Sequence, residues 1–361
     1  MRIPVYEPCL DEAETENVLK CLREGWISSK GEFIDRFEAD FANYVGSSQA
    51  ISVSNGTVAL HLALLALGLG PGDEVIIPGL TYVATANSVA YVGATPVLSD
   101  INPDDWNIDV DRLESLITSK TKAIIPVHLY GMPCHMEQIV DIASRHNLFI
   151  IEDCAEALGS KINGKHVGTF GDIATFSFYG NKTITTGEGG MVVTNDRMLG
   201  MKTRKLKGQG LSDKEYYHDV VGYNYRMTNI CAAIGVAQLG KLNSILTRKS
   251  EIADRYRCAL SLFARFQPDL LGYTNSYWMV SCILPGCNIA AIRNHLSVNG
   301  IETRPFFYPI NKLPMYKACS EIPTSEKISP MGLNLPSSPN LTDRDVDFIS
   351  KLLVDFMNNN I

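Results

Sequence analysis

The sequence predicts an α/β fold, with a mixed, mostly parallel sheet flanked by helices and a smaller α+β region toward the C-terminus. Three observations support this fold class. The chain has 361 residues, which is more than one ordinary compact core needs. Apolar runs rich in β-branched residues recur along its first half, and segments with helical spacing separate them, as in chains that form parallel sheets.

The strands and helices of the sheet region are predicted from the apolar runs and from the segments with helical spacing. Continuous apolar runs indicate strands buried on both faces, and they lie at 50–54, 74–78, 95–99, 122–129, 148–153, 172–178 and 190–195. Helical spacing lies between them at 57–67, 84–92 and 136–146. A Gly/Thr-rich loop, with no helix, separates the last two runs, so we expect one antiparallel strand there.

The second half of the chain follows a different pattern. A long helical pattern over 229–260 exceeds the usual length of a globular helix and is interpreted as the bridge between two domains. A strand is expected at 277–284, a helix at 289–300 and a terminal helix from about 342. We therefore predict a large α/β domain over 1–235, including the N-terminal segment, and a small α+β domain over 236–361.

Composition and charge exclude several classes of function. A formal net charge of −7 does not provide the basic field that nucleic acids and anionic membranes require. Nine cysteines without a CxxC pair indicate reduced thiols, and the N-terminus shows no apolar export signal, so a cytoplasmic protein is expected. The histidines form no HExxH or zinc-type cluster, and no metal site is predicted.

The segment Ser54-Asn55-Gly56-Thr57 ends a strand and starts a helix. Gly56 allows close approach of the backbone, and the first helical N–H groups attract an anion such as phosphate. The alternative is a plain strand-to-helix turn with Thr57 as its cap.

A second segment, from Ile151 to Glu156, is acidic and ends a buried strand, at the edge where open α/β sheets bind ligands. Asp153 is placed to meet a cationic ligand atom, such as a protonated pyridine nitrogen. In the alternative interpretation, Asp153 caps the next element and Glu156 faces solvent.

Lys182 lies in the loop SFYGNKTITTGEGG, which leaves a buried strand. Aromatic neighbours would lower its pKa by desolvation and favour the neutral amine that forms a Schiff base. The alternative is a solvated surface lysine.

These residues carry a family resemblance over nearly the whole chain. The segments SNGT, EDCAEALGS, SFYGNKTITTGEGGMVVTND and GYNYRMTNICAAIGVAQL resemble the DegT/DnrJ/EryC1/StrS sugar aminotransferases, which have the aspartate-aminotransferase-like (type I) fold of enzymes dependent on pyridoxal 5′-phosphate (PLP). The resemblance implies a homodimer, L-glutamate as amino donor, a nucleotide-linked keto-sugar as acceptor and pyridoxamine phosphate as the intermediate form of the cofactor.

Finer motifs narrow the expected acceptor. WISSKG, NKTITTGEGG, YNYRMTNICAAIG and ETRPFFYP are most similar to family members that aminate C4 of GDP-4-keto-6-deoxy-D-mannose to form GDP-perosamine for O-antigen or surface polysaccharide. The alternatives are a sister enzyme for a dTDP- or UDP-linked keto-sugar, and a PLP-fold protein that binds without turnover. Lys182 disfavours the latter.

The resemblance also implies roles for individual residues. Lys182 would bind the cofactor covalently, and Asp153 would pair with its pyridine nitrogen. The remaining cofactor contacts would be Gly56, Thr57 and Ser177 at the phosphate, Tyr82 on the ring, Glu156 near the ring hydroxyl, and Asn229 reaching the phosphate of the partner subunit. Where Glu156 stands many relatives have Gln or His, and where Asn311 stands they often have His, so the sequence leaves both roles open.

An anionic substrate needs local donors, because the net charge does not supply them. The candidates are Lys30, His218, Arg226, Arg304 and Tyr308, of which the arginines could grip a carboxylate or phosphate with two parallel bonds. Each residue also has a purely structural alternative: a solvated turn lysine for Lys30, a core or capping histidine for His218, an ion pair within a dimer for Arg226, and packing for Arg304 and Tyr308. A nicotinamide dehydrogenase is disfavoured because no GxGxxG follows the first strand, and a P-loop kinase is disfavoured because Gly180-Asn181-Lys182-Thr183 lacks the preceding GxxxxGK frame.

Overall fold

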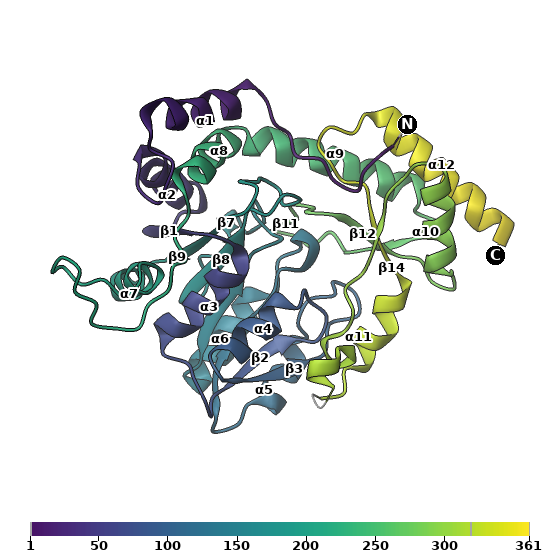
Figure 1. The fold of residues 1–361 in the computed structure, drawn as a ribbon. Coiled ribbons are helices and arrows are strands. Elements are labelled where there is room, and N and C mark those ends of the chain that lie inside the picture. The colour runs from purple at the N-terminus through teal and green to yellow at the C-terminus, as the bar shows by residue number, and fades with distance from the viewer. Residues whose placement is uncertain (1, 318–319, 361) are drawn as a thin grey trace.

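A seven-stranded sheet with helices on its two faces forms the larger part of the molecule (Figure 1). The computed structural model describes residues 2–317 and 320–360. The strands of this sheet are, in spatial order, β1 (Gln49–Val53), β9 (Gly190–Thr194), β8 (Ile173–Ser177), β5 (Phe149–Asp153), β4 (Thr121–Ile124), β2 (Glu74–Pro78) and β3 (Thr95–Ser99).

The direction of the strands confirms the predicted mixed sheet. β9 runs antiparallel to both of its neighbours, β1 and β8, while the pairs from β8 through β5, β4 and β2 to β3 are parallel. The carboxyl ends of β1, β5 and β8 therefore lie at one edge of the sheet, which brings the residues that follow each strand close together.

Helices cover both faces of this sheet and have local start signals. Asp11 and Glu14 form a capping box at the first helix, and Asn55 and Asp196 cap two others through their side chains. The helices of this part are α1 (Glu12–Glu24), α2 (Glu32–Val45), α3 (Gly56–Leu67), α4 (Ala84–Tyr91), α5 (Val110–Leu116), α6 (Met136–His146) and α7 (Arg197–Lys207).

The predicted single long helix over 229–260 is two helices. α8 (Asn229–Gly240) and α9 (Leu242–Ala259) meet at Lys241 with a bend of 61°. Lys241 is held at this corner, because its Nζ lies 2.7 Å from Asp11 Oδ2 and 2.8 Å from Glu14 Oε1. The periodic pattern continues through the corner, so the sequence did not reveal the break.

α9 connects two hydrophobic cores, as expected of a bridge. Leu242 and Ile245, near its start, belong to a core with α2 and α8. Ile252 and Tyr256, further along, belong to the core of the smaller region. The packing thus changes within α9 and not at the predicted boundary between 235 and 236, and the division into two domains stays a prediction.

The smaller region contains a four-stranded sheet and three helices. Its strands are β10 (Arg265–Phe266), β12 (Val280–Ile283), β14 (Gly332–Leu335) and β13 (Arg304–Pro305), and its helices are α10 (Ile289–Val298), α11 (Pro323–Ile328) and α12 (Asp343–Asn360). A third, small sheet consists of β11 (Tyr273–Thr274), β6 (Lys161–Ile162) and β7 (Lys165–His166). Four 3₁₀ turns complete the described elements: η1 (Leu129–Gly131), η2 (Ile310–Lys312), η3 (Pro314–Tyr316) and η4 (Ser329–Met331).

The N-terminal segment packs on the smaller region, although it was expected to belong to the large domain. The amide of Ile3 donates to Gly300 O at 2.8 Å, and the Ile3 side chain is buried in the core formed by α9, α10 and α12. Figure 1 shows this segment starting beside α12 and running toward α1.

Within the described residues, none of the individual helices combines the length and apolar character required of a membrane span. α8 and α9 pass that test only when taken together as a bent pair.

Candidate active site

The start of α3 forms the first wall of a pocket. Asn55 Oδ1 accepts from Val58 N at 3.0 Å, while Gly56 and Thr57 line the pocket in the first turn. Ser177, at the end of β8, lies directly against this turn, since a Cβ on Gly56 would come within 2.8 Å of Ser177 Cβ. The N-terminus of a twelve-residue helix and a hydroxyl thus meet at one place, as an anion site requires.

Asp153 ends β5 and faces the same pocket. Its Oδ2 accepts from Thr85 Oγ1 at 2.8 Å, and its Oδ1 accepts from Ala155 N at 3.1 Å. Burial raises the pKa of Asp153, whereas these two hydrogen bonds and the charge of Lys182 act in the opposite direction. A cationic group bound opposite Asp153 would therefore favour its ionised form.

Lys182 enters the pocket from the loop between β8 and β9. Its Nζ lies 3.8 Å from Glu156 Oε1 and 3.9 Å from the centroid of the Trp278 ring. Burial lowers the pKa of Lys182, against the opposing charges of Glu156 and Asp153. This environment favours the neutral amine, which is the nucleophilic form.

Glu156 lies between Lys182 and a strained backbone turn. Its Oε2 accepts from Tyr130 N at 2.9 Å, and Tyr130 has a left-handed backbone with φ of 56°. Burial raises the pKa of Glu156 to about 7, in spite of the nearby Lys182 amine. Glu156 can thus hold or release a proton close to neutral pH.

One pocket of about 590 Å³ contains these groups. Seven of the predicted cofactor residues line it: Gly56, Thr57, Tyr82, Asp153, Glu156, Ser177 and Lys182. Aromatic side chains form much of the remaining wall, with the rings of Tyr82 and Phe307 5.6 Å apart. The volume suits a ligand of small-molecule size.

Asn229 does not line this pocket within one chain, and its expected reach to a partner's phosphate stays a prediction. Its side chain is buried within its own chain, where Oδ1 accepts from Phe33 N at 3.1 Å and Nδ2 donates to Trp26 O at 2.8 Å. Asn229 is the first residue of α8, so its amide joins this helix to the turn before α2.

The five predicted substrate donors also lie outside the lining of this pocket. All five are exposed: Lys30, His218, Arg226, Arg304 and Tyr308. Arg304 pairs with Glu302 at 2.6 Å and borders a separate hollow on the smaller region, and His218 Nδ1 lies 2.8 Å from Gln209 O. Asn311, whose role was open, donates to Glu326 Oε1 at 2.7 Å. Within one chain these residues do not converge with Lys182.

Sequence reasoning missed several residues of the pocket. Thr85 lies in the predicted helix after 84, but its role depends on Asp153, which belongs to a distant strand. Trp278 and Phe307 come from the smaller region, and their contact with the pocket follows from how that region packs on the sheet. Asn181 and Glu188 follow the strand before Lys182 and could have been found from the loop itself.

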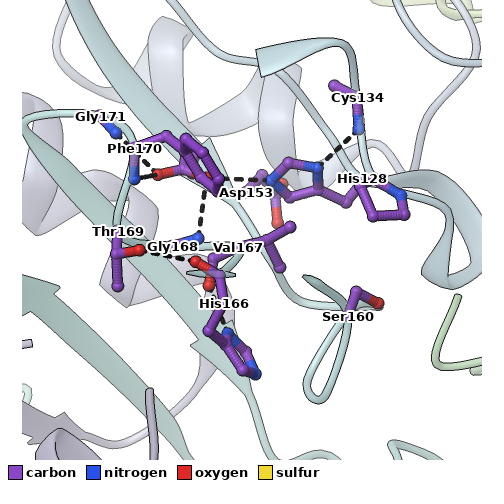
Figure 2. A network of polar contacts seen from close by, with 12 residues as sticks. His128, Cys134, Asp153, Ser160, His166, Val167, Gly168, Thr169, Phe170 and Gly171 are labelled. Carbon is purple, nitrogen blue, oxygen red and sulfur yellow. Dashed lines mark hydrogen bonds and ion pairs between the residues drawn. The ribbon is translucent and has the colours of Figure 1, made fainter. Parts of the chain in front are cut away.

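A buried carboxylate supports the chain around Asp153. Glu152 accepts from the amides of Gly168, Phe170 and Gly171 at 2.7 to 2.8 Å, and its Oε2 lies 3.2 Å from His128 Nε2. Because His128 Nδ1 accepts from Cys134 N at 3.0 Å, the ring proton lies on Nε2 and points at Glu152. Figure 2 shows the hydrogen bond between His128 and the Cys134 amide, and labels Asp153 and the amide donors Gly168, Phe170 and Gly171.

This network fixes the ionisation of Glu152. Burial alone would raise its pKa, but the hydrogen bonds from His128 and the amides bring it below the ordinary value. The ligand atoms of His128, Glu152 and Cys154 lie within 4.8 Å of one another, as in metal sites. The oxygens of Glu152 already accept four hydrogen bonds, so the cluster serves the fold without an ion.

Comparison with known proteins identifies the family of the chain. Residues 8–354 match the DegT/DnrJ/EryC1/StrS aminotransferase family. A GDP-perosamine synthase of Escherichia coli O157:H7 is 53% identical over 98% of both chains, and a GDP-perosamine synthase of Vibrio cholerae is 47% identical over 99% of both. A protein of Streptococcus pneumoniae named as a sugar aminotransferase, in its PLP form, superposes with a TM-score of 0.95 at 29% identity, covering 100% of both chains.

Proposed function

The chain belongs to the DegT/DnrJ/EryC1/StrS aminotransferase family, and from this premise we propose that it transfers the amino group of L-glutamate to C4 of GDP-4-keto-6-deoxy-D-mannose, forming GDP-perosamine. The observation that carries the proposal is the meeting of Lys182, Asp153 and the start of α3 in one pocket. The acceptor is inferred from the full-length identity to two GDP-perosamine synthases.

The pocket has a matching group for each end of PLP. The N-terminal turn of α3 with Ser177 suits the phosphate, and Asp153 suits a protonated pyridine nitrogen. Lys182 offers a buried amine whose nearest carboxylate oxygen, in Glu156, is 3.8 Å away, beyond hydrogen-bonding distance. Tyr82 and Phe307 offer aromatic faces for a flat ring. These residues fit PLP.

When bound, PLP supplies an electron sink for the pair of electrons left when a proton leaves a substrate carbon. In the first half of the reaction, the Lys182 amine would take the proton from the α-carbon of L-glutamate. In the second half, the same amine would give a proton to C4 of the sugar. Asp153 would stay ionised and pair with the protonated ring nitrogen of the bound cofactor.

In this proposal Glu156 exchanges a proton with Lys182. With a pKa of about 7 and 3.8 Å from Lys182 Nζ, it can take up a proton as the amine changes its charge. Trp278 and Phe307 add aromatic surface to the wall of the pocket near these two groups.

We also propose a cytoplasmic homodimer whose partner chain completes the sugar-nucleotide site. The exposed cations Lys30 and Arg226 lie outside the pocket in a single chain, as expected of residues that act across an interface. Mixing two inactive variants, Lys182→Ala and Arg226→Ala, tests this idea. Mixed dimers regain activity only if the two residues serve one site from different chains.

The central experiment is an absorption spectrum of the PLP-loaded protein, followed by L-glutamate and then by each keto-sugar. We expect a visible band from Lys182-bound cofactor, its loss with L-glutamate, and its return with the GDP-linked sugar. Return with a dTDP- or UDP-linked sugar would assign a sister enzyme, and no response to L-glutamate would indicate a binding protein. Lys182→Ala should lack the band, while Lys202→Ala, an exposed lysine on α7, should keep it.

A further inference from the structure

The loop that carries Lys182 is held on both sides by side chains from distant parts of the chain. Trp278 Nε1 donates to the carbonyl of Asn181 at 2.7 Å. The hydroxyl of Tyr6 donates to the carbonyl of Thr183 at 3.2 Å. The two residues that flank Lys182 thus have their carbonyl oxygens fixed from outside the loop.

Lys249, a residue of α9, contacts both supporting residues, Trp278 through its backbone carbonyl and Tyr6 through its ring. Lys249 Nζ donates to the carbonyl of Trp278 at 3.2 Å and lies 5.0 Å from the centroid of the Tyr6 ring. It also donates to the carbonyl of Ser337 at 2.8 Å, and the amide of Ser337 donates to Val5 O, next to Tyr6. A single amine therefore joins the two supports of the Lys182 loop.

Burial of the Lys249 amine at this position is energetically unfavourable. It is 1% exposed, and burial lowers its pKa to about 7. Within the described residues, the groups within hydrogen-bonding distance of its amine are carbonyls, and no carboxylate pairs with it. An apolar side chain of similar length would avoid the cost of burying an amine, so stability alone does not explain a lysine here.

Trp278 also contacts the reactive amine directly, because its ring centroid lies 3.9 Å from Lys182 Nζ. The position of this ring limits the directions in which the amine can point. We propose that Lys249 is a positioning residue that, through Trp278 and Tyr6, fixes the loop and the amine of Lys182. The proposal rests on the role of Lys182 in the proposed function.

The test compares Lys249→Met, Trp278→Phe and Tyr6→Phe with the wild type. Lys249→Met keeps an unbranched side chain and removes its amine, whereas the other two keep an aromatic ring and remove one hydrogen-bond donor. Lys207→Met is the matched control. Lys207 is largely covered, with a side chain 12% exposed, and its amine pairs with Glu38 at 3.0 Å, away from the Lys182 loop.

The first measurement is hydrogen exchange of the segment 178–186 in the protein without cofactor. We expect Lys249→Met to speed exchange of this segment about tenfold, because an opening equilibrium changes tenfold for about 1.4 kcal/mol, which is the scale of one lost hydrogen bond. Lys207→Met should leave this segment unchanged even where it lowers overall stability.

The second measurement is made on the PLP-loaded protein. The pH midpoint of the Lys182-bound absorption band should shift by about one unit in Lys249→Met. The kcat should fall roughly tenfold or more, with the KM for L-glutamate changed less than about twofold, because a displaced amine affects the chemical step.

The proposal is overturned if a folded Lys249→Met protein matches the wild type both in hydrogen exchange of the segment 178–186 and in the pH midpoint of the Lys182-bound band. If this variant does not fold, Trp278→Phe and Tyr6→Phe decide instead, and the proposal fails if neither changes the exchange of 178–186. A wild-type protein without a Lys182-bound band would refute the proposed function, and the hydrogen-exchange measurement would still test whether Lys249 fixes the segment 178–186.

Discussion

At the scale of single residues, the chemistry of the pocket depends on groups whose ionisation is set by burial and by a few hydrogen bonds. Asp153 and Glu156 are buried and Lys182 is largely covered, and loss of solvent shifts the pKa of each toward the neutral form. Thr85 opposes this shift at Asp153 by donating to its carboxylate. The charge at the site is therefore controlled by neutral neighbours as well as by the ligand.

Replacing Thr85 with Val should weaken cofactor binding. The pKa of Asp153 rises further when its side-chain donor is lost, so a charged partner at the ring nitrogen becomes less favourable. A hydrogen bond to a charged group contributes about 1.5–3 kcal/mol, and we expect a tenfold or greater loss in PLP affinity, measured by fluorescence titration. Ser88→Ala, on the same helix but bonded to Thr85 O, is the control and should bind PLP normally.

At the scale of elements, the site depends on how closely α3 approaches β8. Gly56→Ala should push them apart, since the new Cβ would lie 2.8 Å from Ser177 Cβ. Overpacking of this kind costs about 1–3 kcal/mol, and PLP affinity should fall with it because the phosphate turn moves. Gly240→Ala, where a Cβ meets no atom within 4 Å, should change neither thermal unfolding nor PLP affinity.

The hydrogen bonds of Glu152 also act at the scale of elements, because they connect β5 to the turn of residues 168–171. Glu152→Gln replaces one acceptor oxygen with an NH₂ group that faces N–H donors, so at least one buried donor loses its partner. We expect the free energy of unfolding to fall by about 3 kcal/mol in urea. Glu114→Gln, an exposed partner of Arg145, should lose less than about 1 kcal/mol, and an equal loss in both variants would contradict this account.

At the scale of the whole molecule, α9 and its buried lysine connect the stability of the fold to pH. The pKa of Lys249 is about 7 in the folded protein and has its ordinary, higher value in the unfolded chain. The unfolded chain thus binds more protons above pH 7, and stability rises with pH in this window. Tyr6, the titratable group that faces the amine, has its pKa raised by burial and stays neutral there.

Comparison of the wild type with Lys249→Met isolates this contribution. The wild type should gain up to about 2 kcal/mol in unfolding free energy relative to the variant between about pH 7 and pH 9, since one group contributes at most about 1.4 kcal/mol per pH unit. Denaturant unfolding at several pH values measures the difference. A difference that is independent of pH would mean that Lys249 keeps its proton when the chain folds.

The sequence by itself determined the strands, the fold class and the chemistry-bearing segments. These features are local: β-branched runs predict buried strands, and SNGT, the acidic cluster at Asp153 and the Lys182 loop each follow a strand directly. Because the carboxyl ends of neighbouring parallel strands meet at one edge, local order was enough to bring Gly56, Asp153 and Lys182 together.

Only the tertiary structure decided the contacts between distant segments. Tyr6 reaches the Lys182 loop from near the N-terminus and Trp278 reaches it from the smaller region. Asn229 is buried within its own chain, and the long helical pattern bends at Lys241. No local pattern encodes these contacts, because a side chain's partner depends on how whole elements pack. The residues that we propose to position Lys182 were therefore visible only once the fold was known.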